Sequence, residues 1–250
     1  MSRLTLIRLA AVGVILALIE LVCRVGLITP YTLIPPSQMA AGLFELLRSG
    51  ELALDMLRTV VAIMIAISAA VAFGLIGAIV LSALPRLRRA LDPLMATYYS
   101  VPVFVFYPLF IVLFGLNDVP KVVIGFLLAV VAMITSSLNG FDRVPAVLRK
   151  TARVHRLGRV ATIRRVVLPS AAPHIFNGIK LAVAYAFVGV LGAEFILSTG
   201  GIGYRIAYAF NDFDNRRMYA LVVLILVVVS VVNAALFGWE RRLRQRRGLT

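Results

Sequence analysis

Long apolar segments alternate with short polar ones along the chain, and this pattern predicts a bundle of membrane-spanning helices. A helix crosses the hydrocarbon core of a bilayer with about 20 apolar residues. Segments of about that length occupy residues 9–28, 57–84, 92–114, 122–138, 174–197 and 218–238. Pro102 and Pro108 fall inside the third segment, where they are expected to kink the helix. We therefore expect an all-α integral membrane protein in which residues 1–250 form a single domain of about six spans.

The polar intervals predict the connections between these segments. Residues 29–55 contain a proline-rich connection, followed by a short amphipathic helix from Ser37 to Arg48. Glycine, proline and charged residues further along predict a tight basic loop at 85–89, a short turn at 115–120, a glycine-rich turn at 198–204 and then a polar loop to Arg217.

The interval at residues 140–170 predicts a helix–glycine–helix elbow. Side chains at helical spacing lie on both sides of a break at Leu157-Gly158. They are Val144, Val147, Leu148, Thr151 and Val154 before the break, and Val160, Ile163 and Val167 after it. Pro169 is expected to end the second helix at Leu168, with Ser170 as the N-cap of the next one. Because seven of the 26 Lys and Arg residues lie between 149 and 165, this basic elbow is expected to lie on a membrane surface and contact a soluble partner protein.

Composition excludes several other classes of protein. The chain is 61% hydrophobic and 15% charged, with a mean hydropathy of +0.98, whereas soluble domains are about half apolar and about a quarter charged. Cys23 is the only cysteine, and His155 and His174 are the only histidines, so neither a disulfide nor a metal site is expected. No glycine-rich phosphate loop with Lys-Ser/Thr occurs. We therefore expect no ATP hydrolysis and no cofactor in this chain.

The net charge of +15 lies on one side of the predicted bundle. The segments on the side of the two termini hold 18 Lys and Arg residues against three acidic residues, while those on the other side hold six of each. Cytoplasmic loops carry this excess of basic residues, so both termini and the elbow are expected to be cytoplasmic. This placement argues against nucleic-acid binding and assigns the arginines at 241–247 to topology and contact with anionic lipid.

Five short motifs, in the right order, carry a resemblance that covers almost the whole chain. Lys150-Thr151-Ala152, Arg156 and the sequence from Arg164 to Pro169 lie where permease subunits of binding-protein-dependent ABC importers have Glu-Ala-Ala, Gly and an Ile/Val-x-Leu-Pro-like ending. The other four motifs are Leu33–Ser37, Ser49–Leu52, Val101–Phe110 with Phe114-Gly115, and Gly192–Glu194 with Gly201–Tyr204. The chain most closely resembles the nitrate/sulfonate/taurine branch of these type I importers.

The sequence departs from that family at three places. Lys150 replaces the motif Glu, which would form a salt bridge to the ATPase, and Arg156 replaces the motif Gly at the turn. Ser136-Ser137 stands where the family has Asn-Thr near the end of the fourth span.

The resemblance implies a transport subunit, not an enzyme, in a bacterial inner membrane. Its expected partners are two cytoplasmic subunits that bind ATP and Mg, a second permease (most often an identical copy), an extracytoplasmic solute-binding protein and membrane lipid. The expected substrate is a small polar solute, either a nitrate-, sulfonate- or taurine-like anion or a small heterocycle. Candidate ATPase-coupling residues are Leu148, Thr151, Ala152, Arg153, Val154, His155, Arg156, Leu157 and Gly158. Candidate pathway or gate residues are Tyr99, Pro102, Phe106, Ser136, Tyr185, Glu194, Gly200, Gly201 and Gly203.

Several alternatives remain open at this point. The elbow arginines could set topology or hold anionic lipid, and the aromatic side chains could pack in the bundle instead of lining a pathway. Glu194 either lines the pathway, braces the glycines at 200–203 or is a structural partner within the bundle, whereas Glu20 and Arg24 are spaced to pair. An ATP-independent carrier or channel and a rhomboid-like protease are the competing functions. The protease would need a Ser–His pair deep in a span.

Overall fold

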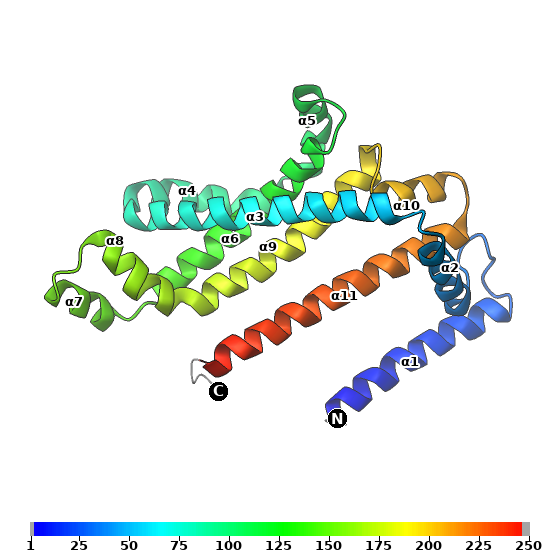
Figure 1. Cartoon of the computed structure of the whole chain (residues 1–250), viewed down its shortest axis with the longest axis horizontal. Coiled ribbons are helices and arrows are strands. Elements are labelled where there is room, and N and C mark those ends of the chain that lie inside the picture. Colours follow the sequence, from blue (N-terminus) through cyan, green and yellow to red (C-terminus); the bar gives the residue numbers. More distant parts are fainter. Residues whose placement is uncertain (1–2, 247–250) are drawn as a thin grey trace. The chain divides into compact units, whose positions relative to one another are not determined.

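The computed structural model describes the backbone of residues 3–246, and every regular element in that range is helical (Figure 1). The side chains of residues 3–5, 8, 9, 243, 244 and 246 also lie outside the described part, and so does most of the basic tail. The chain divides into two compact units, one formed by residues 58–199 and the other by residues 1–57 with 200–250.

Helices long and apolar enough to cross a membrane confirm the membrane class. Four qualify, at Ala53–Ala83, Val119–Asp142, Arg159–Asn211 and Asn215–Arg242. A fifth is counted if the bent pair Pro85–Ser100 and Val103–Phe114 forms one span. The N-terminal span stays a prediction: α1 (Arg3–Arg24) is helical, but several of its side chains are not described.

The unit of residues 58–199 is built on a close pair of helices, α6 (Val119–Asp142) and α9 (Leu168–Leu197). Glycines allow this closeness: a Cβ added to Gly189 would lie 2.6 Å from Cα of Gly125. The long helix α3 (Ala53–Ala83) also packs on α6, and a Cβ on Gly74 would lie 2.7 Å from the Met133 side chain. Small residues commonly mediate such contacts in membranes, because no hydrophobic effect drives helices together there.

The third predicted span is broken, and its two halves meet at a bend of 88°. It consists of α4 (Pro85–Thr97), two short 3₁₀ turns (Tyr98–Ser100 and Val103–Phe106) and α5 (Tyr107–Phe114). The kink expected at Pro102 is therefore confirmed, whereas Pro108 lies in the first turn of α5, where a proline is accommodated without a kink. Val101, which precedes Pro102, is extended at φ −92° and ψ 120°, as the clash with a proline ring requires. The prediction of a tight basic loop at 85–89 is wrong, because these residues form the first turn of α4. Pro85 is favourable there, since the first N–H group of a helix has no partner within the helix.

The elbow has two arms, α7 (Ala146–Val154) and α8 (Arg159–Thr162), joined by residues 155–158. The prediction that Pro169 ends the second arm is wrong. Leu168 is helical at φ −59° and ψ −47°, and α8 continues through a π turn (Ile163–Val167) into α9. The N–H of Leu168 donates to the carbonyl of Ile163, so the π turn shifts the bonding pattern just before Pro169, which has no N–H to contribute.

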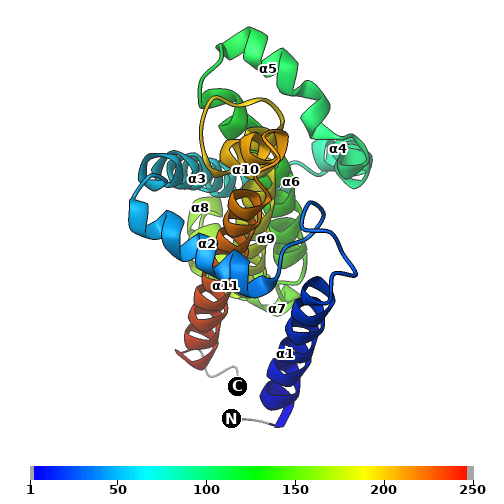
Figure 2. The ribbon, with the colours of Figure 1, turned by 90° about the vertical axis from the view of Figure 1, so that its right-hand side faces the viewer.

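The unit of residues 1–57 and 200–250 contains α1, α2 (Pro36–Ser49), α10 (Ile202–Asn211) and α11 (Asn215–Arg246). Figure 2 shows α2 lying across α11, and Gly42 allows the contact because a Cβ there would lie 3.3 Å from Cβ of Ala220. The Glu20–Arg24 pair is confirmed at 2.7 Å. The polar loop predicted before Arg217 is wrong, because most of it forms the amphipathic helix α10, and only residues 198–201 remain of the glycine-rich turn.

Candidate functional site

The elbow presents apolar side chains to the outside of a strongly basic segment. Val147 and Val154, seven residues apart and therefore on one face of α7, are 70% and 80% exposed, and Val160 on α8 is 78% exposed. Leu148 is 41% exposed beside them, and Thr151 is exposed on the same face. A side chain of this kind gains from burial against a partner, so the expected apolar stripe exists on α7.

The elbow is held firmly by the helices behind it. Val144 is buried with Leu138 and Phe141 rather than belonging to the exposed stripe, and Ala152 is the buried residue of α7. The Arg88 guanidinium donates two hydrogen bonds, of 2.8 and 2.6 Å, to the two carboxylate oxygens of Asp142 at the end of α6. Paired Arg–carboxylate bonds fix orientation as well as distance, so α4 is held to the end of α6, where the elbow begins.

The turn between the arms depends on Arg156 and not on Gly158. Arg156 has φ 50°, in the left-handed region that glycine adopts most easily, whereas Gly158 has φ −63°. The N–H groups of Arg156 and Leu157 donate back to the carbonyls of Arg153 and Ala152, closing the end of α7. The predicted break at Leu157-Gly158 therefore lies within the turn of residues 155–158. The left-handed residue of this turn is Arg156, at the position where the family motif has its glycine.

The remaining coupling candidates lie on different sides of the elbow. Arg153, His155 and Gly158 are exposed, whereas Leu157 is half-buried and lines a cavity behind α7 together with Arg153. The structure thus brings Leu148, Thr151 and Val154 to one face and sends Arg153 and Leu157 to another.

Two of the pathway candidates are stacked on each other. The rings of Tyr99 and Tyr185 lie 5.2 Å apart at an interplanar angle of 19°, and Tyr98 meets Tyr99 edge-on at 5.4 Å. The Tyr98 hydroxyl donates to the carbonyl of Leu127 at 3.0 Å and the Tyr99 hydroxyl to that of Leu128 at 3.3 Å. Tyr98 and Tyr99, which lie where the third predicted span is broken, are thereby held against α6.

Two further pathway candidates, Pro102 and Phe106, lie where the third predicted span is broken. Pro102 separates the two 3₁₀ turns and is exposed, and Phe106 ends the second turn with 42% of its surface exposed.

Glu194 is buried and lies within a network of charges. Its carboxylate accepts a hydrogen bond from the Thr59 hydroxyl at 2.9 Å and lies 2.8 Å from Nζ of Lys121, which is itself fully buried. Lys121 also lies 2.9 Å from the carboxylate of Asp118. Within its unit, Glu194 therefore has the geometry of a structural ion pair that joins α3, α6 and α9.

The two serines at the Asn-Thr position lie between α6 and α9. The Ser136 hydroxyl donates to the backbone carbonyl of His174 at 2.8 Å and is buried. Ser137 is completely buried, and its hydroxyl has no hydrogen-bond partner among the described residues. Both side chains thus face the helix interface in this conformation. His174 therefore contacts Ser136 through its backbone carbonyl and not through its imidazole ring.

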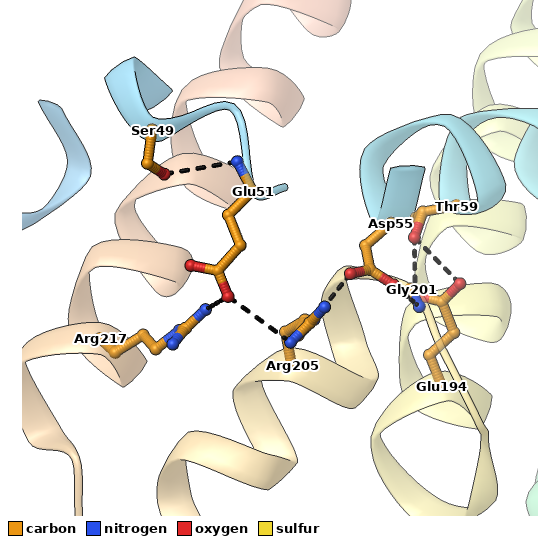
Figure 3. A network of polar contacts seen from close by, with 8 residues as sticks. All are labelled: Ser49, Glu51, Asp55, Thr59, Glu194, Gly201, Arg205 and Arg217. Carbon is orange, nitrogen blue, oxygen red and sulfur yellow. Dashed lines mark hydrogen bonds and ion pairs between the residues drawn. The ribbon is translucent and has the colours of Figure 1, made fainter. Parts of the chain in front are cut away.

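The glycine-rich turn is anchored to the start of α3 by a carboxylate that the sequence pattern did not single out. Gly201 has φ 109°, and its N–H donates to Oδ1 of buried Asp55 at 2.9 Å (Figure 3). Nε of Arg205 donates to Oδ2 of the same carboxylate at 2.6 Å, and Glu51 pairs with both Arg205 and Arg217. Gly200 and Gly203 are buried beside this turn.

Sequence reasoning counted Asp55, Lys121 and Arg205 only as charges outside the membrane. Each stands in or beside the first turn of a helix next to an apolar run, a position where a charge is unexpected unless it is paired. That position is the signal that could have found them.

The fold is that of a helical membrane chain with a basic elbow between two of its spans and an anchored glycine-rich turn, and the comparison with known families gives its class. The family described as "Binding-protein-dependent transport system inner membrane component" matches residues 62–248, and the chain belongs to this family. It is a multi-pass inner-membrane permease of an ABC importer.

Curated relatives from three organisms place the chain in one branch of that family. It is 26% identical to the taurine transport system permease protein TauC of Escherichia coli (strain K12), over 99% of this chain and 92% of the relative. It is 28% identical to the putative aliphatic sulfonates transport permease protein SsuC of Bacillus subtilis (strain 168), over 94% and 85%. The nitrate import permease protein NrtB of Leptolyngbya laminosa is 28% identical over 74% of this chain and 64% of its own length.

Proposed function

We propose that the chain forms the translocation pathway of its importer and that the exposed face of the elbow docks into a cytoplasmic ATP-binding subunit. The observation that carries this proposal is the apolar surface of Val147, Val154 and Val160 on an otherwise basic segment. Interfaces typically have an apolar centre and a charged rim, and the elbow offers both. The complete importer would contain two copies of the ATPase, a second permease identical to this one and an extracytoplasmic solute-binding protein.

The proposed direction of coupling follows from the anchoring of the elbow. Hydrolysis of ATP by the partner would move α7, and the Arg88–Asp142 bonds and the packing of Val144 would pass that movement to α4 and α6. This chain would then alternate between two conformations without hydrolysing ATP itself. The excess of basic residues on the elbow favours a cytoplasmic location for it and for both termini.

We propose a small sulfonate, taurine-like or nitrate-like anion as the substrate, because the relatives named above carry those names. Tyr99, Tyr185 and Phe106 are the proposed pathway residues, since they are aromatic, partly exposed and next to the break at Pro102. The glycines at 200–203, held by Asp55 and Arg205, are the proposed outer gate. A small heterocycle is the second candidate class of substrate.

Docking is tested by mass spectrometry of the soluble proteins that co-purify with the detergent-extracted chain, where an ATP-binding subunit is expected. Val154→Glu places a charge at the centre of the apolar face, and we expect the ATPase subunit to be lost while the chain remains in the membrane. Ser170→Glu is the matched control, because Ser170 is exposed at the start of α9 and lies off that face. Equal recovery of the ATPase subunit with both variants would contradict the docking face.

A further inference from the structure

A cavity of about 480 Å³ lies behind the elbow, on the side of α7 opposite the exposed valines. Its walls come from the end of α3, from α6, from α7 and from the segment Arg159–Val167. The guanidinium-bearing residues Arg149, Arg153 and Arg159 line it, together with the apolar side chains of Ile79, Leu157 and Ile163. Cavities of this volume are typical of small-ligand sites.

The three arginines concentrate positive charge at the cavity. Arg149 donates a hydrogen bond to the carbonyl of Phe141 and also interacts by charge with Asp142, which lies outside the cavity lining. No carboxylate lines the cavity, and no ion pair joins any of the three to another described residue. The acidic side chain that follows α6, Asp142, is engaged by Arg88 in a two-bond pair. Convergent like charges of this kind raise the local concentration of anions and favour a bound one.

The cavity is separate from the proposed docking face. Arg149 and Arg153 are four residues apart and share one face of α7, whereas Val147 and Val154 occupy the opposite one. A ligand in the cavity would therefore contact the back of α7 while its front remained available to a partner protein.

We propose that this cavity binds the phosphate-containing headgroup of an anionic phospholipid. Arginine side chains bind phosphate with paired hydrogen bonds, and the apolar wall of Ile79, Leu157 and Ile163 suits the adjoining acyl methylenes. Basic pockets between membrane helices on the cytoplasmic side bind lipid headgroups in this way. The proposal rests on the cytoplasmic orientation of the elbow given under the proposed function, and it assigns to the bound lipid the role of holding α7 against α3.

The test uses the purified full-length chain without the ATP-binding subunit, so that a failure of docking does not affect it. Binding of short-chain phosphatidylglycerol is titrated by native mass spectrometry, with phosphatidylcholine of the same chain length and inorganic phosphate as comparisons. The variant Arg153→Gln/Arg159→Gln removes two cavity charges. Its matched control is Arg164→Gln/Arg165→Gln, which removes the same charge from two exposed arginines that do not line the cavity.

We expect the wild type to bind phosphatidylglycerol in preference to phosphatidylcholine, and the cavity variant to bind it about 30-fold more weakly. If that variant is not monodisperse, the single change Arg159→Gln is expected to weaken binding about fivefold. The control pair should stay close to the wild type.

Three results would overturn the proposal. Equal losses of phosphatidylglycerol affinity in the cavity and control variants would mean that the lipid responds to surface charge in general and not to this cavity. Competition by inorganic phosphate at the concentration of the lipid would make the cavity a site for the free ion. Release of the lipid on addition of the ATP-binding subunit would assign the cavity to the docking surface.

Discussion

The buried pair of Lys121 and Glu194 supports the sharpest prediction about the stability of the bundle. Both side chains are removed from solvent, and their charged atoms lie 2.8 Å apart. Removing one member of a buried ion pair costs about 3–5 kcal/mol, because the other charge is left buried, whereas replacing both by apolar residues is often neutral or stabilising. The double variant should therefore be more stable than either single variant.

The structure also orders the single variants. Glu194→Leu leaves Lys121 next to Asp118, 2.9 Å away and half exposed, so we expect a loss near 3 kcal/mol, at the lower end of that range. Lys121→Met removes the cation that pairs with Glu194, and we expect a loss across the full range of about 3–5 kcal/mol. Lys121→Met/Glu194→Leu is expected to recover most of the loss, since Met and Leu fill similar volumes.

The assay is a double-mutant cycle on the detergent-purified chain, measured as the free energy of unfolding from denaturant titrations followed by helix content. Thr59→Val is a useful third variant, because it removes the hydroxyl that is shared between the two carboxylate oxygens of Glu194, and it should cost about 1–3 kcal/mol. Losses that simply add in the double variant would refute the reasoning, because independent contributions would mean that the two charges do not depend on each other.

Three further predictions concern single backbone or hydroxyl positions, all followed by the same unfolding titration. Arg156→Gly should raise the free energy of unfolding by about 0.5–1 kcal/mol, because glycine adopts φ 50° without steric cost, and Arg156→Val should lower it. Gly201→Ala should cost about 1–3 kcal/mol and reduce uptake, because φ 109° strains any side chain; unchanged uptake would argue against a gate there. Ser137→Ala should lie within about 0.5 kcal/mol of the wild type, because the buried hydroxyl has no described partner to lose, and a larger loss would reveal one.

The sequence pattern located most of the membrane helices and the elbow, because both signals are local. Hydrophobic runs and a 3.6-residue period require only neighbouring residues, so α2, α6, α7 and α11 lie close to their predicted ranges. The same local reasoning missed α10, which carries a single charged residue, Arg205, but lies between the glycine-rich turn and the charged residues at 212–217. It also overestimated the ability of Pro169 to end a helix. The π turn at Ile163–Val167, just before Leu168, lets the helix continue through Pro169.

At the elbow, too, the sequence located the segment, while the tertiary structure decided which way its side chains face. The coupling residues were predicted as one continuous segment, whereas the helix geometry of α7 turns Val147 and Val154 outward and Arg149 and Arg153 toward the cavity. The turn residue is Arg156 rather than Gly158, because a backbone dihedral depends on how the two arms are held and not on residue type alone.

The sequence by itself determined the class of this protein: apolar length, the one-sided charge and ordered motifs define a membrane permease before any contact is known. Tertiary structure alone decided which charges pair, since Lys121 and Glu194 are 73 positions apart, and Asp55 and Gly201 are 146 apart. The physical reason is that the cost of burying a charge can be offset only by a partner in space, and the amino-acid pattern does not record which residues the packing of α3, α6 and α9 brings together.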